Sequence, residues 1–214
     1  MPIEKINSVS RLSLSPFSLN ESEAVLSTIF SPSGALMATV GSTGEAKILL
    51  VSARSDRSNW PLLRVLRDEE ETELEEFFTG AFWGNQFVAA GKRKSRRKWD
   101  NGEGDHAVLS GVVKIFDLKS GRCVQRLTGV HSEEILFVLT EEQVSGVGEA
   151  ALITCGQDGL MARWQKQVNK PPQVVKAGDM VFHAEIWENF IFAAVDNFLK
   201  VFDRRNLKVN EGRN

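Results

Sequence analysis

The chain has 214 residues, of which 42% are hydrophobic and 25% are charged, and its net charge is −2. This composition fits one folded domain with a substantial core and excludes membrane, fibrous and globally disordered chains. Cys123 and Cys155 form no CxxC pair, so we expect neither a disulfide framework nor a cysteine-rich zinc site. No secretory signal is present and no apolar run approaches the ~18 residues of a membrane span, so we expect an intracellular protein.

Short runs rich in Val, Ile, Leu and Phe recur along the whole chain, separated by Gly, Asn, Asp and Ser. Such runs are typical of β-strands, and no long stretch with helical periodicity competes with them. In chain order, we predict strands over residues 25–30, 35–41, 46–51, 62–66, 77–83, 86–91, 112–117, 123–127, 134–139, 152–156, 160–164, 173–176, 180–187, 190–195 and 199–203.

The predicted strands fall into four similar units. In three of them the second strand ends in a small residue, at Gly41, Gly91 and Gly156. A four-stranded unit that recurs every ~40–45 residues is typical of propeller blades, because one small sheet cannot bury both faces until neighbours stack on it. We therefore predict an all-β propeller of about four four-stranded blades. The blades cover residues 22–68, 75–129, 131–178 and 179–210, after an N-terminal extension or stray outer strand at residues 1–21.

The third unit resembles the WD40 family of β-propellers most clearly, through residues 154–164, which read TCGQDGLMARW. The resemblance implies that His131, Thr154, Asp158 and Trp164 form a hydrogen-bonded set with a structural role. An otherwise buried indole N–H and imidazole need such partners. Closed propellers of this family usually have seven blades, so we expect a partial propeller. Its open hydrophobic blade faces should pair with another chain or aggregate.

A narrower resemblance is to the Polycomb-group WD40 subunits of the embryonic ectoderm development type. It rests on the order and spacing of residues 38–41, 76–82 and 113–116. It implies a chromatin reader that binds methylated lysine in an aromatic cage, with Phe78 as one wall. Such a cage needs several aromatic faces. The alternative interpretation is that Phe78 is a core residue of its strand.

Six of the seven residues from 92 to 98 are basic, namely Lys92, Arg93, Lys94, Arg96, Arg97 and Lys98. They open an insertion over residues 92–111, which we expect to be a solvated hairpin loop. Such a cluster suits phosphate backbones or a nuclear-import receptor, and Trp99 adds a stacking face. The alternative is a surface insertion without a function. We expect nuclear residence from this run, with the cytoplasm as the alternative.

Residues 68–76 are opposite in charge, with seven acids in nine positions, among them Glu69, Glu70 and Glu71. This segment joins the first unit to the second. Three interpretations are open: it binds a basic partner such as a histone tail, it screens the basic run within the same molecule, or it is a solvated connector.

Enzyme-like patterns give no support for catalysis. Residues 146–151 fit a loose dinucleotide fingerprint but precede a predicted strand, and residues 100–105 lack the spaced ligands of a calcium loop. His106, His131 and His183 have no metal-ligand spacing. We therefore expect no enzyme, cofactor, metal site, small-molecule substrate or membrane partner. The favoured function is a scaffold or adaptor for protein–protein interaction in a multi-protein complex, with a chromatin reader or a nucleic-acid-binding module as alternatives.

Overall fold

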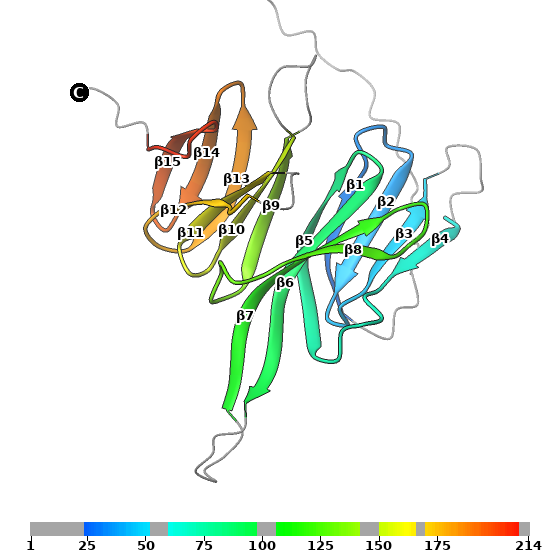
Figure 1. Ribbon diagram of the computed structural model, residues 1–214. Helices are drawn as coiled ribbons and strands as arrows, with labels where there is room; N and C mark the ends of the chain where they lie inside the picture. The colour runs from blue at the N-terminus through cyan, green and yellow to red at the C-terminus, as the bar shows by residue number, and fades with distance from the viewer. Residues whose placement is uncertain (1–23, 52–59, 98–105, 142–149, 166–169, 210–214) are drawn as a thin grey trace, which may run out of the picture.

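The computed structural model describes residues 24–51, 60–97, 106–141, 150–165 and 170–209. Within these ranges it contains fifteen β-strands in four antiparallel sheets, which follow one another along the chain (Figure 1). The expected N-terminal extension, residues 1–21, lies outside the described residues. No helix in the described part of the chain is long and apolar enough to cross a membrane.

We number the sheets as blades 1 to 4 in chain order. Blade 1 contains β1 (Val25–Phe30), β2 (Leu36–Gly41), β3 (Ala46–Leu50) and β4 (Leu62–Leu66). Blade 2 contains β5 (Leu74–Trp83), β6 (Gln86–Arg97), β7 (His106–Asp117) and β8 (Cys123–Leu127). Blade 3 contains β9 (Ile135–Glu141), β10 (Ala151–Gly156), β11 (Leu160–Gln165) and β12 (Gln173–Lys176). Blade 4 contains β13 (Val181–Trp187), β14 (Phe190–Val195) and β15 (Phe198–Asp203). The sequence therefore predicted the all-β fold and its strand order correctly.

The structure differs from the sequence prediction in two places. Blade 4 has three strands rather than four among the described residues, and a single bridge between Phe202 and Val209 marks where a further strand would pair. Strands β6 and β7 have 12 residues each, so most of the expected loop over residues 92–111 is an extended hairpin. Opposite charges that face each other across β5 and β6 stabilise this extension.

The core consists of three apolar clusters, one between each pair of successive blades. Alternate residues of a strand point to opposite faces of its sheet, so an inner blade contributes to two clusters. In β10, for example, Leu152 packs toward blade 2 and Ile153 packs toward blade 4. The contact between blades 1 and 2 includes Phe77, Phe87 and Phe116, all fully buried. Stacking therefore buries both faces of blades 2 and 3.

The innermost strand of every blade carries a register shift, or bulge, at the same place. The bulged residues are Leu26, Phe78, Leu136 and Phe182. A bulge brings the backbone of the inner strand close to the end of the second strand, which leaves no room for a side chain there. A Cβ atom at Gly91, for example, would collide with the carbonyl oxygen of Glu76. This is the physical reason for the recurring small residues.

We expect Phe116→Ala to lower the free energy of unfolding by about 3–5 kcal/mol, because it removes a buried ring from the contact between blades 1 and 2. The Phe116 ring also packs edge-to-face on Phe77, with centroids 6.5 Å apart. Urea titration followed by tryptophan fluorescence measures the change. Val124→Ala, on the exposed part of β8, should stay within about 0.5 kcal/mol of wild type. Equal effects of both changes would contradict the assigned blade contact.

Candidate functional site

The acidic segment and the basic run predicted from the sequence lie against each other in blade 2. In the sheet register, Glu76 faces Lys92 and Glu75 faces Arg93. Lys92 Nζ lies 3.1 Å from Glu76 Oε2, and Lys94 Nζ lies 2.9 Å from Glu76 Oε1. The first half of the basic run is therefore paired β-strand and not a solvated loop. Of the three interpretations of the acidic segment, the structure shows the one in which it screens the basic run.

Three other residues of the acidic segment converge on one buried lysine. Lys114, in the middle of β7, is fully buried, and its Nζ lies 2.5 Å from Asp68 Oδ2, 2.8 Å from Glu71 Oε2 and 3.1 Å from Glu75 Oε1. A buried ammonium is tolerated only when it is paired, because the loss of hydration costs several kcal/mol. We use the name charged seam for Lys114 and its three acidic partners, together with Arg126 of β8 and the ion pairs between β5 and β6.

Arg126 of β8 completes the charged seam from the outer side. Its Nε donates to Asp68 Oδ2 at 2.6 Å and its Nη2 donates to Asp68 Oδ1 at 2.5 Å, which is the bidentate geometry of a strong arginine–carboxylate pair. The same guanidinium bonds Glu70 at 2.8 Å, although Glu70 is largely exposed. Asp68 therefore links the connector after blade 1 to both β7 and β8.

The carboxyl groups of the charged seam titrate in different directions. The bidentate hydrogen bond from Arg126 holds the pKa of Asp68 well below its usual range, despite partial burial. Burial opposes ionisation of Glu71, but the hydrogen bond and the charge of Lys114 and a hydrogen bond from the backbone of Glu73 together outweigh burial and lower the pKa of Glu71. Burial raises the pKa of Glu75 to about 7, and Lys114 offsets this effect only in part. Glu75 is therefore the group of the seam that titrates near neutral pH.

A lysine recurs at the position of Lys114 in two other blades. Lys47 in β3 and Lys200 in β15 face the same side of their blades, as the register with Thr39 and Ala193 shows. Lys200 Nζ donates to the carbonyl oxygen of Ala177 at 2.6 Å, in the segment that joins blades 3 and 4. Lys114 likewise reaches the segment that joins blades 1 and 2. Lys114 and Lys200 thus each tie a blade to the connector that precedes it.

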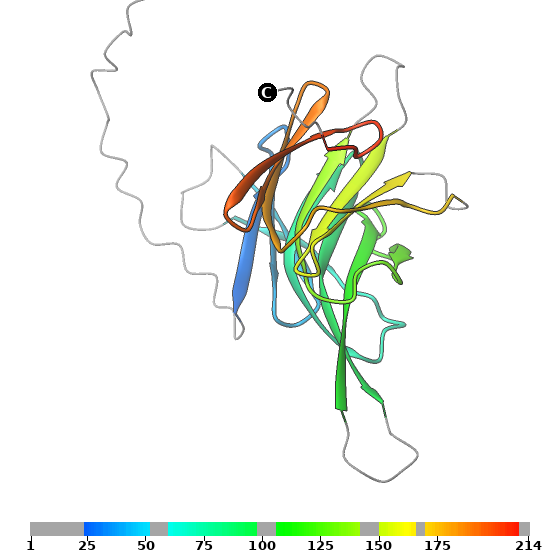
Figure 2. The ribbon, with the colours of Figure 1, turned by 90° about the vertical axis from the view of Figure 1, so that its left-hand side faces the viewer.

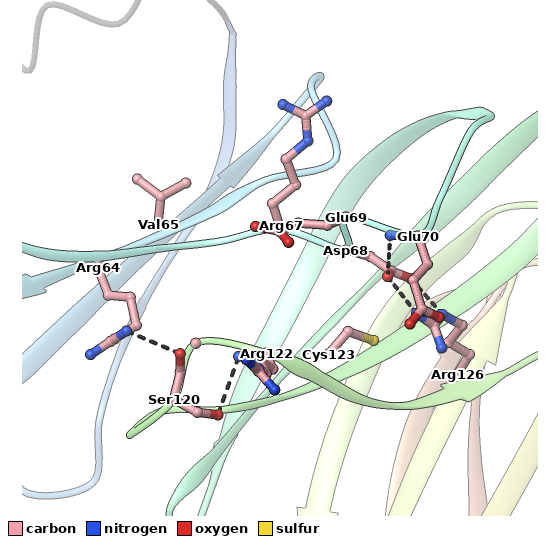
Figure 3. A pocket seen from close by; sticks show the side chains of 11 residues that line it. Arg64, Val65, Arg67, Asp68, Glu69, Glu70, Ser120, Arg122, Cys123 and Arg126 are labelled. Carbon is pink, nitrogen blue, oxygen red and sulfur yellow. Dashed lines mark hydrogen bonds and ion pairs between the residues drawn. The ribbon is translucent and has the colours of Figure 1, made fainter.

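A surface cavity of about 490 Å³ lies beside the seam, between β4 and the turn from β7 to β8 (Figure 3). Arginine side chains from both elements line it, and Arg64 Nη1 donates to the carbonyl oxygen of Ser120 at 3.1 Å. Glu69 is on the rim. Cys123 is the only nucleophilic thiol of the lining, and burial raises its pKa to about 11, which keeps it protonated and unreactive. The cavity can hold a polar group, but its lining supplies no activated nucleophile.

The four residues implied by the WD40 resemblance lie together in blade 3. Trp164 Nε1 donates to Thr154 Oγ1 at 3.0 Å, and Thr154 Oγ1 lies 2.8 Å from His131 Nε2. His131 Nδ1 lies 3.1 Å from Asp158 Oδ1, which also accepts from the backbone of Leu160 at 3.1 Å. Because the hydroxyl accepts from the indole, it can donate to Nε2, and we assign the imidazole proton to Nδ1. The set fixes a turn and performs no chemistry.

Phe78 lies at the bulge of β5 and is half-buried, and it is not among the buried core residues. Lys92 Nζ lies 4.9 Å from its ring centroid, and the same ammonium bonds Glu134 at 2.8 Å. The chain's own lysine therefore covers one face of the Phe78 ring.

The outer half of the basic run continues beyond these ion pairs. Strand β5 pairs with β6 as far as Lys94, and past this point β6 pairs only with β7, up to Arg97 opposite His106. Arg96 and Arg97 are thus placed farther out than any residue of β5. Lys98 and Trp99 lie outside the described residues, as do residues 100–105 and 146–149 of the two rejected motifs.

Sequence reasoning missed Lys114, Arg126 and the buried state of Glu75. One signal was present: Lys114 is the single charge in the apolar run from Val112 to Phe116. A charge inside a core strand needs a partner, and the acidic segment was the obvious source. Among the described residues, no group of three or more His, Cys, Asp or Glu side chains could hold a metal ion.

Comparison with known proteins identifies the fold. No protein-family model and no characterised sequence matches the chain. Solved structures match with TM-scores of 0.63 for "Structure of U3-55K" and 0.64 for "Crystal structure of RRP9 WD40 repeats", each at 12% identity over 88% of this chain and 51% of that chain. "Crystal Structure of Mitotic Checkpoint Complex" matches with a TM-score of 0.63 at 16% identity, over 89% and 52%. The chain has the WD40 propeller fold and spans about half the length of these chains.

We expect Glu75→Gln to change the pH dependence of stability. The pKa of Glu75 is raised from 4.5 to about 7 in the folded chain, so its contribution to stability is present below pH about 4.5 and is lost as the pH rises through about 7. The amide cannot ionise, so the variant should gain stability relative to wild type between these pH values. Urea unfolding at pH 4.5, 6 and 8 measures this gain. Glu133→Gln, at an exposed site, should keep the wild-type profile, and a wild-type profile for Glu75→Gln would contradict the assignment.

Proposed function

We propose that this run of WD40-type blades is a non-catalytic scaffold that docks other proteins in a multi-protein complex, and that the β6–β7 hairpin is its principal partner-binding element. The observation that carries the proposal is the length of the hairpin. Strands β6 and β7 have 12 residues each, whereas β2 and β3 of blade 1 have 6 and 5. The hairpin therefore projects from the body of blades in both views (Figures 1 and 2).

The base of the hairpin is held from both sides, which favours a fixed orientation. On one side β5 pairs with β6 and the charged seam binds its lysines. On the other side the backbone N–H of Gly111 donates to the carbonyl oxygen of His131 at 3.0 Å, and Lys92 bonds Glu134 at 2.8 Å. A binding element on a rigid base loses less entropy when a partner docks.

The outer part of the hairpin offers backbone edges for pairing. Among the described strands, residues 95–97 of β6 and 106–108 of β7 pair only with each other. Unpaired edges of a two-stranded ribbon can accept an extended segment of another protein as an added strand. Arg96 and Arg97 lie on this part, so a partner segment with acidic side chains suits it best.

Two alternatives receive less support. Histone-tail reading through Phe78 would require its ring face, which Lys92 covers. Nucleic-acid binding would draw on the whole basic run, but Lys92, Arg93 and Lys94 each have acidic neighbours in the charged seam. The positive charge left for phosphates is a small footprint for nucleic acid.

We expect Arg96→Ala/Arg97→Ala to abolish capture of the protein partners that the tagged wild-type chain binds in its native cell. Loss of two charges on the docking strand weakens the contact, whereas the fold is kept because the seam is intact. The matched control is Lys119→Ala/Lys176→Ala, which removes two exposed charges elsewhere and should capture as wild type does.

Nuclease treatment of the lysate separates the outcomes of this capture. Protein partners that persist after nuclease and disappear in the arginine variant support the proposal. If only nucleic acid is recovered, or if the arginine variant keeps every partner, the proposal is wrong.

We also propose nuclear residence, because Arg96 and Arg97 of the basic run extend past β5 and Lys98 follows them in the sequence. Triple alanine substitution should shift a fluorescent fusion from nucleus to cytoplasm, and a large inert carrier is needed because a 23.8 kDa chain is small enough to diffuse. Lys119→Ala/Lys176→Ala is again the control. A wild-type distribution of the triple variant would show that import does not use this run.

A further inference from the structure

The cavity beside the charged seam is lined mainly by charged side chains. It has a volume of about 490 Å³ and lies where β4 of blade 1 meets the turn from β7 to β8 of blade 2 (Figure 3). Its acids are residues 68–70, and its four arginines are Arg64, Arg67, Arg122 and Arg126. What the cavity can bind depends on which of these charges the chain itself already neutralises.

Five charged groups at the cavity are paired with one another. Arg126 holds Asp68 in bidentate geometry and also bonds Glu70 at 2.8 Å. Arg67 Nη1 lies 3.4 Å from Glu45 Oε1, in blade 1. Because these groups already have partners of opposite charge, they add little attraction for a ligand.

Arg64 and Arg122 are different, because within the described part of the chain neither guanidinium forms an ion pair. Arg64 donates one hydrogen bond from Nη1, to the carbonyl oxygen of Ser120 at 3.1 Å. A guanidinium carries five N–H donors, so most of those on Arg64 remain for a ligand. Glu69, on the rim, is the acid of the lining that forms no ion pair among the described residues. The unpaired charge of the cavity is therefore mainly positive.

The turn from β7 to β8 holds Arg64 in position. A Cβ atom at Gly121 would lie 2.8 Å from Arg64 Cδ and would displace it, and the φ of +77° at Gly121 also favours glycine. Ser120 is fixed in turn, because its hydroxyl donates to Asp117 Oδ1 at 2.7 Å. Arg122 follows in the same turn, and Figure 3 shows Arg64 and Arg122 on either side of Ser120. Much of the site is thus formed before a ligand binds, which lowers the entropy cost of binding.

A phosphoryl group suits these two arginines best. Guanidinium groups match phosphate oxygens with bidentate hydrogen bonds. A phosphate monoester on a side chain carries a charge of roughly −1.5 to −2 near pH 7, which two guanidinium groups neutralise. A carboxylate carries only one negative charge and would leave one of the two arginines unpaired.

The surroundings of the cavity favour a peptide segment over a small phosphate ester. Arg64 and Arg122 are exposed, so the open side of the cavity would leave much of a small ligand in water. Strand β4 is the outermost of its sheet among the described strands, and its free edge offers backbone groups to an extended segment. Leu63 and Val65 of this strand are 50% and 41% exposed and offer apolar contacts to the same segment.

We infer that the cavity between β4 and the β7–β8 turn binds a phosphoserine or phosphothreonine of a partner protein. Arg64 and Arg122 bind the phosphate, and Glu69 on the rim receives a basic side chain of the same segment. The site is separate from the β6–β7 hairpin, because β7 begins at the hairpin and ends at this turn. The inference shares with the proposed function only the premise that the chain docks other proteins.

The test is binding of the purified full chain to immobilised peptide libraries. One library has phosphoserine and phosphothreonine at a fixed central position, flanked by degenerate positions. Two matched libraries have serine and threonine, or glutamate, at the centre. The phosphorylated library should retain wild type at least about 10-fold more strongly than either matched library, because only the phosphate satisfies both guanidinium groups.

Variants of the two arginines locate the binding. Arg64→Ala and Arg122→Ala should each weaken retention by about 10-fold or more, as loss of a charged hydrogen-bond partner does. Arg64→Lys and Arg122→Lys keep the charge but lose the bidentate geometry, so they should lie between the alanine variants and wild type. Lys119→Ala removes a charge from the same turn outside the cavity lining and should bind as wild type does. Circular dichroism checks that the variants are folded.

Other outcomes overturn the inference. Equal retention by the serine and threonine library excludes phosphate recognition, and equal retention by the glutamate library shows a carboxylate site. Free O-phosphoserine that competes as well as a phosphorylated peptide shows a site for small phosphate esters.

The hairpin provides the last comparison. Retention that survives both alanine variants but is lost in Arg96→Ala/Arg97→Ala places the phosphate on the hairpin and excludes the cavity. Capture of native partners depends on Arg96 and Arg97 in the proposed function, whereas peptide retention depends on Arg64 and Arg122. Failure of one proposal is therefore distinguishable from failure of the other.

Discussion

A small antiparallel sheet with apolar side chains on both faces is stable only when both faces are covered, and the rest of this structure depends on that constraint. Blades 2 and 3 satisfy it through the three apolar clusters. A bulge recurs in the first strand of every blade, and a glycine lies opposite it in blades 1 to 3. The constraint also makes the end blades informative, since their outward faces retain the pattern of the buried ones.

Charge in this chain is mainly used to join blades. Lys114 lies on a stacking face, and it is compatible with burial there only because Asp68 and Glu71 of the preceding connector and Glu75 of β5 surround its ammonium group. Lys200 makes the corresponding contact in blade 4 without a carboxylate, because its ammonium group donates to the backbone carbonyl oxygen of Ala177. The acidic segment and the basic run would suggest two binding sites, but they mainly contact each other. Only the outer end of the β6–β7 hairpin extends past this contact.

The sequence was sufficient for the fold because strand periodicity and blade repetition are local signals. The bounds of β4, β8, β12 and β14 agree with the prediction to the residue. The set of His131, Thr154, Asp158 and Trp164 followed from a family resemblance, and the structure brings these side chains together. The charged seam could not be predicted in the same way, because register decides which charges meet. The hairpin was predicted as a solvated loop because six positive charges in seven residues cannot be buried, and the pairing of Lys92 and Lys94 with Glu76 accommodates a strand there.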